Sequence, residues 1–428
     1  MDQSLCRASS ASAGRGLSGT RQLHTNTSAG NMRPMSFGRH LRDEWLLDQS
    51  ITYLNHPTVG ATPRRVLDAQ RAIMAEAERQ PSRFQLRELT EHIVGHWRPE
   101  KPRLRVAADA VAAFINARGE DVVFVDNTTA GANAVLRSFQ FEPGDEVLLS
   151  ELCYGGVARA ATYAARERGA RVTTVQMPQP LEPVAVADAF VAAVTPRTRI
   201  AIVEHIVADA AVILPLQEIT QRLKARGVAV LADGAHAPGA VTLDVPSLGV
   251  DWYIANLHKS AFVPRSSGFL WATPERQAGL HPTVISWGLD EGFTAEFDLV
   301  GTRDASAHLA APAAFAFINS FGLDRILAYN HGLAWNGARM LAQTWGTSFD
   351  MPDALIPTMA SVPLPESLGT TRDAAGTLRD ALLFEDQIEV GVHGWRGQLY
   401  VRVAAQIYND MDDYERLAAA VLKRGGSR

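Results

Sequence analysis

The stretch VAVLADGAHAPGAVTLDVPSLGVDWYIANLHK, residues 228–259, contains the pattern that decides the fold. Two short apolar runs, Val228–Asp233 and Trp252–Asn256, flank a segment rich in glycine and proline. Apolar runs of this length, bounded by turn residues, predict buried β-strands. Because ligands of α/β sheets bind beyond the carboxyl ends of the strands, we expect Asp233 and Lys259 to lie at such a crevice.

The same pattern extends in both directions along the chain. Five further apolar runs predict strands at Val122–Val125, Glu146–Ser150, Arg171–Met177, Arg199–His205 and Ser267–Ala272. Helices are predicted at Ala130–Phe139, Val157–Arg168, Pro183–Val194 and Leu216–Arg226. Strands that alternate with helices indicate βαβ units, so the expected class is α/β with a mostly parallel, seven-stranded sheet.

Three regions are expected from composition and pattern. Residues 1–36 are rich in Ser, Thr, Ala and Gly, and predict a disordered leader, although an organellar transit peptide has a similar composition. We expect the protein to be located in the cytoplasm.

Residues 37–310 would form a large domain with an N-terminal segment. Residues 311–428 would form a smaller α+β domain, with helices at Ala311–Phe321, Arg325–Trp345 and Asp412–Lys423 and strands at Ile388–Val392 and Gln398–Ala404.

Composition excludes several classes of protein. The 428 residues carry a net charge of −5, which argues against nucleic acid or an anionic membrane as the main partner. Apolar runs are far shorter than the roughly 20 residues that span a bilayer. Two cysteines, Cys6 and Cys153, exclude a disulfide framework, and we interpret Cys153 as a buried thiol. His92 and His96 lack a third ligand, so we predict no metal site.

Lysine is rare, which narrows the places for amine chemistry. The chain has four lysines, Lys101, Lys224, Lys259 and Lys423. Lys259 alone follows an apolar strand, where burial would lower the pKa of its amine and make it a nucleophile. The alternative is a surface lysine with a buried stem and an exposed head.

Asp233 and Lys259 together indicate a pyridoxal phosphate (PLP) enzyme. PLP chemistry needs a lysine that forms a Schiff base and an acid that keeps the pyridine nitrogen protonated. Both residues stand at predicted strand ends. Taken alone, Asp-Gly is an ordinary turn signal, and that reading stays open here.

A phosphate site is predicted where residues 126–132 follow one strand and open a helix. Free backbone N–H groups and the positive end of a helix bind anions, and Thr128 and Thr129 would add hydroxyls. Asn256 and His258 share one face of a strand or tight turn and could reach the same phosphate. A helix cap without a ligand is the alternative.

With these residues in place, the chain resembles the class V aminotransferases, a family of fold-type I PLP-dependent enzymes. Within that family it is most similar to the isopenicillin N epimerase-like branch. The resemblance covers about residues 43–425 and rests on six motifs in family order. They are Tyr53–His56, Asn127–Asn133, Asp233–His236, Leu257–Lys259 with Phe262–Arg265, Gly301–Asp304 and Val401–Asn409.

The resemblance implies a role for each matching residue around the cofactor. Lys259 would form the Schiff base, Asp233 would pair with the pyridine nitrogen, and His236 would hydrogen-bond the phenolic oxygen. The phosphate would be held by Thr128, Thr129, Asn256 and His258. Thr302 would reach the phosphate of a second subunit, because the family forms homodimers with shared active sites.

The resemblance also implies an amino-acid substrate and residues that bind it. Arg402 would bind the substrate carboxylate through its planar fork, with Asn55 nearby. Tyr154 lies where the family stacks a ring on the cofactor. Pro57 replaces the glycine that usually follows Asn-His in the family, so we expect this loop to have a different shape. From pattern alone, Arg402 could instead face outward on a half-buried strand, and residues 55–56 could be a simple turn.

The expected reaction is epimerisation at the α-carbon of an amino acid. Lys259 would remove the α-proton, and His56 or Tyr154 would act as the acid on the opposite face. The alternatives are a class V aminotransferase and a carbon–sulfur lyase of an S-substituted cysteine. A desulfurase that passes on persulfide sulfur needs a mobile cysteine, and no cysteine follows Cys153. A non-catalytic PLP-fold sensor is the alternative outside enzymes.

Overall fold

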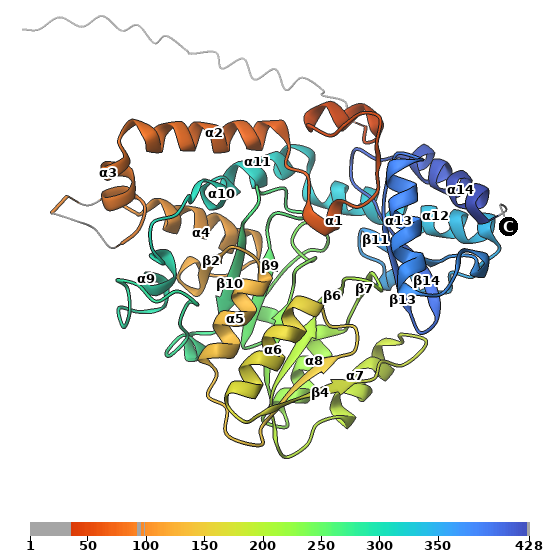
Figure 1. Cartoon of the computed structure of the whole chain (residues 1–428). Coiled ribbons are helices and arrows are strands. Elements are labelled where there is room, and N and C mark those ends of the chain that lie inside the picture. Colours follow the sequence, from red (N-terminus) through yellow and green to blue (C-terminus); the bar gives the residue numbers. More distant parts are fainter. Residues whose placement is uncertain (1–35, 92–95, 98, 426–428) are drawn as a thin grey trace, which may run out of the picture. The chain divides into compact units, whose positions relative to one another are not determined.

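The computed structural model describes residues 36–91, 96–97 and 99–425, and a seven-stranded sheet lies at its centre (Figure 1). Across the sheet the strands follow the order β2 (Val122–Val125), β10 (Gly268–Ala272), β9 (Trp252–Asn256), β8 (Ala229–Asp233), β5 (Thr198–Glu204), β3 (Glu146–Ser150) and β4 (Arg171–Val175). Pairing from β9 to β4 is parallel, and β10 alone runs antiparallel to its neighbours. The predicted α/β class and mostly parallel sheet are confirmed.

All seven predicted strands are present, with ends that differ by at most two residues. The largest difference is at β4, which ends at Val175 rather than at Met177. The backbone N–H of Met177 donates to the Glu151 carboxylate at 2.8 Å instead of joining the sheet. A side-chain acceptor therefore ends this edge strand earlier than its apolar pattern indicates.

Two apolar layers enclose the sheet because side chains alternate along each strand. In β8, Val230 and Ala232 join one hydrophobic core, whereas Ala229 and Leu231 join the core on the opposite face. The second face is covered by α5 (Thr128–Ser138), α6 (Gly155–Glu167) and α9 (Phe293–Asp298). The first is covered by α4 (Arg103–Phe114), α7 (Pro183–Ala192), α8 (Leu216–Lys224) and α11 (Ala311–Phe321). Burial on both faces explains the nearly continuous apolar runs.

A second, three-stranded sheet is built from the C-terminal part of the chain. Its antiparallel strands are β11 (Met359–Pro363), β14 (Gln398–Ala404) and β13 (Gly391–Trp395). Helices α12 (Leu323–Trp345), α13 (Arg372–Phe384) and α14 (Met411–Gly425) lie around it (Figure 1). Its hydrophobic core is separate from the two cores of the large sheet, and contacts change from one core to the other along α12. A domain boundary at residue 311 stays a prediction.

The remaining elements are short or belong to the N-terminal half. They are β1 (Thr52–Tyr53), β6 (Ile206–Val207), β7 (Val212–Ile213), β12 (Ile388–Glu389), α1 (His56–Val59), α2 (Arg64–Arg79), α3 (Pro81–Arg83) and α10 (Ser306–Leu309), with short 3₁₀ or π turns at Arg39–Glu44, Phe84–Glu88, Gly119–Asp121, Pro246–Leu248, Pro274–Arg276, Asp353–Leu355 and Glu366–Leu368. β1 pairs in parallel with β12, so the N-terminal segment joins the C-terminal region.

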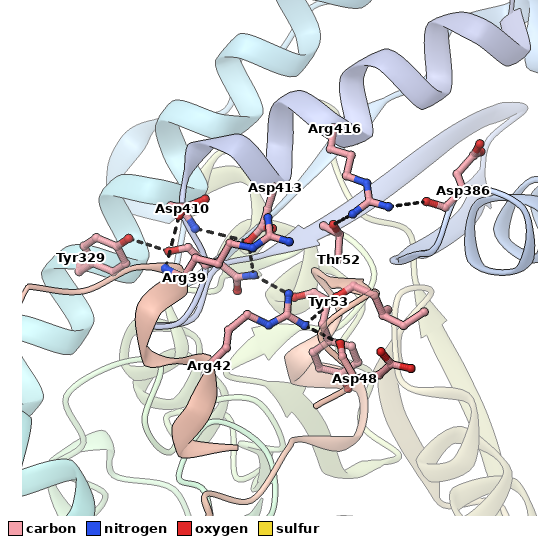
Figure 2. Close-up of polar contacts among 12 residues, drawn as sticks. Arg39, Arg42, Asp48, Thr52, Tyr53, Tyr329, Asp386, Asp410, Asp413 and Arg416 are labelled. Carbon is pink, nitrogen blue, oxygen red and sulfur yellow. Dashed lines mark hydrogen bonds and ion pairs between the residues drawn. The ribbon is translucent and has the colours of Figure 1, made fainter. Parts of the chain in front are cut away.

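Polar contacts fix that N-terminal segment against α14 (Figure 2). Arg39 Nη1 lies 3.3 Å from a carboxylate oxygen of Asp413, whose side chain is fully buried. Arg416 Nη1 donates to the hydroxyl oxygen of Thr52 at 3.1 Å. The loop that follows β1, which carries Asn55 and His56, is therefore held by the C-terminal part of the chain.

Two sequence predictions lie outside the described residues. They concern residues 1–35 of the leader and His92 of the histidine pair. Among the helices that are described, none has the length and apolar character needed to cross a bilayer.

Candidate active site

Lys259 stands just beyond the carboxyl end of β9, as predicted. Its Nζ lies 3.1 Å from Nε2 of His236. Burial and the positive charge of Arg402 lower the pKa of the Lys259 amine to about 7, and Asp233 opposes the shift. The neutral amine, which is the nucleophilic form, is therefore well populated near neutral pH.

Asp233 and His236 occupy the carboxyl end of the neighbouring strand, β8, and the turn after it. Asp233 is 3% exposed, and one oxygen accepts the backbone N–H of Ala235 at 2.9 Å. Burial raises the pKa of Asp233, while that hydrogen bond and Lys259 pull the pKa down. His236 is also buried, and its Nδ1 has no hydrogen-bond partner in the described part of the chain.

The N-terminus of α5 meets the end of β9 at the predicted phosphate site. The Asn256 amide oxygen accepts the backbone N–H of Thr128 at 3.0 Å, so the two elements are joined directly. Thr129 is partly exposed beside it. The Nδ1 of His258 lies 2.8 Å from the carbonyl oxygen of Ser267, and burial lowers the pKa of this histidine. A neutral imidazole, two hydroxyls and a positive helix end therefore gather at one place.

These residues fit PLP on their own chemistry. A buried carboxylate such as Asp233 calls for a cationic or N–H partner, which a protonated pyridine nitrogen provides. The unpartnered Nδ1 of His236 and the amine of Lys259 lie beside it. The helix end at Thr128 suits a phosphate. The pyridine nitrogen, the aldehyde with its neighbouring phenolic oxygen, and the phosphate of PLP thus each have a matching group in the protein.

Arg402, which is predicted to bind the substrate carboxylate, comes from a different part of the chain. It lies on β14 and is 8% exposed. Its Nη1 donates to the Ala208 carbonyl at 2.8 Å, and its Nη2 donates to the Asn55 amide oxygen at 3.1 Å. Asn55 Nδ2 donates in turn to the Glu389 carboxylate at 2.7 Å. Because Nε of Arg402 is buried without a partner among the described residues, a carboxylate would complete its hydrogen bonding.

His56, which is predicted as an acid, is buried and has a hydrogen-bond partner for each ring nitrogen. It is 1% exposed, with Nδ1 2.8 Å from the Tyr408 hydroxyl and Nε2 3.3 Å from the Lys259 carbonyl. Burial lowers the pKa of His56 to about 4, despite the Lys259 carbonyl. The ring is therefore neutral near pH 7, and each of its nitrogens has a partner within the protein.

Tyr154 and Thr302 are the two predicted residues that lie at the surface. The Tyr154 side chain is 52% exposed, immediately before α6. A Cβ placed on Gly156 would meet both the Tyr154 ring and the Thr129 hydroxyl, so the tyrosine lies beside the phosphate site. Thr302 is exposed, and its neighbour Arg303 reaches Asp126, just before α5, at 3.3 Å. Both roles stay predictions.

Glu204 is a second buried acid, which was not among the residues predicted from the sequence. It ends β5 and lies directly opposite Asp233 in the β5–β8 pairing. Burial and, to a smaller extent, the charge of Asp233 raise the pKa of Glu204 to about 7. The rule that found Asp233, an acid at a strand end, applies equally to Glu204. Cys153 is also nearby, and burial keeps the pKa of its thiol well above the usual value.

Comparisons with known proteins agree with this geometry. The family model "Aminotransferase class-V" matches residues 52–374. A probable chloroplastic L-cysteine desulfhydrase of Arabidopsis thaliana is 31% identical over 404 residues, covering 87% of this chain and 83% of that protein. The isopenicillin N epimerase of Streptomyces clavuligerus is 30% identical over 397 residues, covering 89% and 96%.

A solved structure extends the likeness to the fold. A variant of the protein C-DES, with glycine covalently linked to its PLP cofactor, superimposes with a TM-score of 0.72. It is 19% identical to this chain and covers 89% of it, and this chain covers 98% of that structure. The predicted fold type is therefore confirmed, and with the family match so is PLP as the cofactor.

Proposed function

The chain belongs to the aminotransferase class-V family, with PLP as cofactor, and from this premise we propose that it is a carbon–sulfur lyase. Its substrate would be L-cysteine or an S-substituted L-cysteine, from which it eliminates sulfide or a thiol. The observation that carries this proposal is that both ring nitrogens of His56 have hydrogen-bond partners within the protein. Elimination needs one base on one face of the α-carbon, whereas inversion needs a second acid, and His56 is poorly placed to be that acid.

Each residue of the site has a task in this reaction. When bound, PLP would supply an electron sink that accepts the electron pair of the broken Cα–H bond of the substrate. Asp233 would keep a proton on the pyridine nitrogen, and His236 would hold the phenolic oxygen. The neutral amine of Lys259 takes the α-proton, and the resulting ammonium donates a proton to the departing sulfur. Arg402 fixes the carboxylate, which sets the face that Lys259 meets.

Sulfur leaves directly in this scheme, so no cysteine of the protein takes part. The chain has no cysteine after Cys153, and burial keeps the Cys153 thiol protonated. Four relatives between 29% and 32% identical, two from Arabidopsis thaliana and two from Oryza sativa, carry L-cysteine desulfhydrase names, which supports the same reaction class.

Product analysis in heavy water tests the proposal. PLP-loaded protein is incubated with L-cysteine and with S-(2-hydroxyethyl)-L-cysteine, without a keto acid. We expect pyruvate and ammonia in equal amounts, together with sulfide or 2-mercaptoethanol. Recovery of the D-amino acid carrying α-deuterium, or of a keto acid that still contains sulfur, would contradict the proposal.

Epimerisation is the second candidate, because two relatives named isopenicillin N epimerase are 30% and 32% identical to this chain. Tyr154, beside Thr129, is the residue left to act as the second acid. In that case Tyr154→Phe would abolish inversion while α-deuterium exchange by Lys259 persists. Under the lyase proposal, the same variant still releases the thiol.

We also propose that the active unit is a homodimer. Thr302 is exposed, and the apolar side chains of Val284, Ile285 and Leu289 are exposed as well. Light scattering of the PLP-loaded protein would show twice the chain mass.

A cytoplasmic location stays a proposal as well, since one relative is named chloroplastic and residues 1–35 lie outside the described part. Imaging of the full chain tests it.

A further inference from the structure

A cavity of about 600 Å³ lies between the large sheet and the small C-terminal sheet. Its walls come from the carboxyl ends of β3 and β4, the β6–β7 turn, and the β13–β14 hairpin. Asp209 in that turn directly follows Ala208, whose carbonyl accepts from Arg402. Tyr400 also lines the cavity, and it lies two residues before Arg402 on β14, hence on the same face. The cavity therefore adjoins the carboxylate-binding end of the site.

The cavity is far larger than the side chain of cysteine requires. Clefts of this volume hold ligands of drug-like size. Since Arg402 holds the α-carboxylate and Lys259 faces the α-carbon in the proposed reaction, a group attached to the substrate sulfur would extend into this space. The nature of the lining then decides which sulfur substituents are favoured.

Negative charge dominates that lining. Among the described residues, four carboxylates line the cavity, and no lysine or arginine does. Glu151 is paired with Arg396 at 2.5 Å. The others, Glu182, Asp209 and Asp350, are exposed and form no hydrogen bond or ion pair through their side chains within the described chain. Asp209 also interacts electrostatically with Arg402 and His393, so its charge is partly offset, whereas Glu182 and Asp350 keep theirs. An anionic group would be repelled here, and a cation would be attracted.

Aromatic rings on the hairpin add a second attraction for cations. His393 stacks on Tyr400 with ring centroids 5.6 Å apart, and Trp395 lies 6.5 Å from Tyr400. The guanidinium of Arg396 already lies 4.7 Å from the Trp395 centroid. Rings of this kind attract positive groups through their negative faces, and quaternary ammonium groups are bound in this way.

We propose that this cavity selects cysteine S-conjugates whose sulfur substituent carries a positive charge, an ammonium or quaternary ammonium group. The inference rests on the proposed lyase function, which it narrows to a substrate class. Asp209 and Asp350 supply the charge preference, while Trp395 and Tyr400 supply the aromatic wall.

A matched series of conjugates tests the inference. The three probes are S-(2-aminoethyl)-, S-(2-hydroxyethyl)- and S-(carboxymethyl)-L-cysteine, which are positive, neutral and negative at the sulfur substituent. For PLP-loaded protein we expect kcat/KM to fall in that order, by about tenfold between the first and the last. In Asp209→Asn/Asp350→Asn the ratio of the first to the second probe falls toward one. Glu415→Gln, which removes an exposed acid from α14, leaves the ratio unchanged.

Binding to the Lys259→Ala protein, measured by calorimetry, separates the two proposals. The expected order of affinity is the same as for kcat/KM. If all three probes release thiol at similar rates, or the carboxymethyl probe is preferred, the cation inference is wrong and the lyase function stands. If no probe releases a thiol, the lyase function fails, and the calorimetric order alone decides whether the cavity selects cations.

Discussion

The two halves of the active site are assembled in different ways. The cofactor half comes from neighbouring strands of one sheet, and His236 and Lys259, which contact each other there, are 23 positions apart in sequence. The substrate half joins Arg402 to Asn55 across 347 positions and depends on β1 pairing with β12. In the proposed function, the chemistry would therefore rest on the sheet edge. The choice of substrate would rest on contacts between distant segments.

Removal of the lysine should have the largest effect. Lys259→Ala deletes both the nucleophile for the cofactor and the base for the α-proton. We expect thiol release to fall by about a thousandfold or more. Thiol release assays on PLP-incubated protein measure this, with Lys224→Ala as the matched control on the exposed face of α8. Retention of more than about a tenth of the activity would place the base elsewhere.

The next effect concerns the charge under the cofactor ring. Asp233→Asn keeps the shape of the side chain but cannot hold a proton on the pyridine nitrogen. We expect kcat to fall about a hundredfold, in line with loss of a buried charge-assisted hydrogen bond. Asp412→Asn, an exposed acid on α14, is the control. An unchanged kcat would show that the ring nitrogen needs no acid in this enzyme.

The substrate half should respond through KM. Arg402→Lys keeps the positive charge but loses the planar fork that reaches Ala208 and Asn55. We expect KM for S-substituted cysteines to rise about tenfold or more, with a smaller fall in kcat. Arg79→Lys, which changes an exposed cation on α2, is the matched control. A large fall in kcat at unchanged KM would move Arg402 into the cofactor half.

The smallest expected effect is a pH dependence of PLP capture, which involves Lys259 in the cofactor half only. Because burial lowers the pKa of Lys259 to about 7, the amine is charged below that pH and neutral above it. The rate at which apoprotein captures PLP should therefore rise with pH and level off above about 7. Stopped-flow absorbance across pH 5.5–9 measures it. A rate that keeps rising toward pH 10 would show an ordinary exposed lysine.

The residues predicted for the cofactor half carry local signals in the sequence. The strand that ends at Asp233 and the strand before Lys259 are buried on both faces, and apolar runs of this kind are visible in the chain. The same reasoning missed Glu204, although it obeys the same rule. Arg402 and Asn55 came from family resemblance alone, since alternation along β14 does not show what a side chain meets.

The hydrogen bonds of His56 could not be predicted from the sequence, for a physical reason. Its partners are the Tyr408 hydroxyl, 352 positions away, and a backbone carbonyl that any residue supplies. Neither leaves a pattern in the chain. Long-range contacts of this type engage both ring nitrogens of His56, and they support the proposal of elimination rather than epimerisation.

Trapping the cofactor tests the assignment of the sheet edge most directly. PLP-loaded protein is treated with borohydride, which makes the bond between a lysine amine and the cofactor aldehyde permanent, and the labelled peptide is identified by mass spectrometry. We predict that the label lies on Lys259 and that Lys101, Lys224 and Lys423 stay unlabelled. A label on any of those three, or none on the PLP-loaded protein, would contradict the site described here.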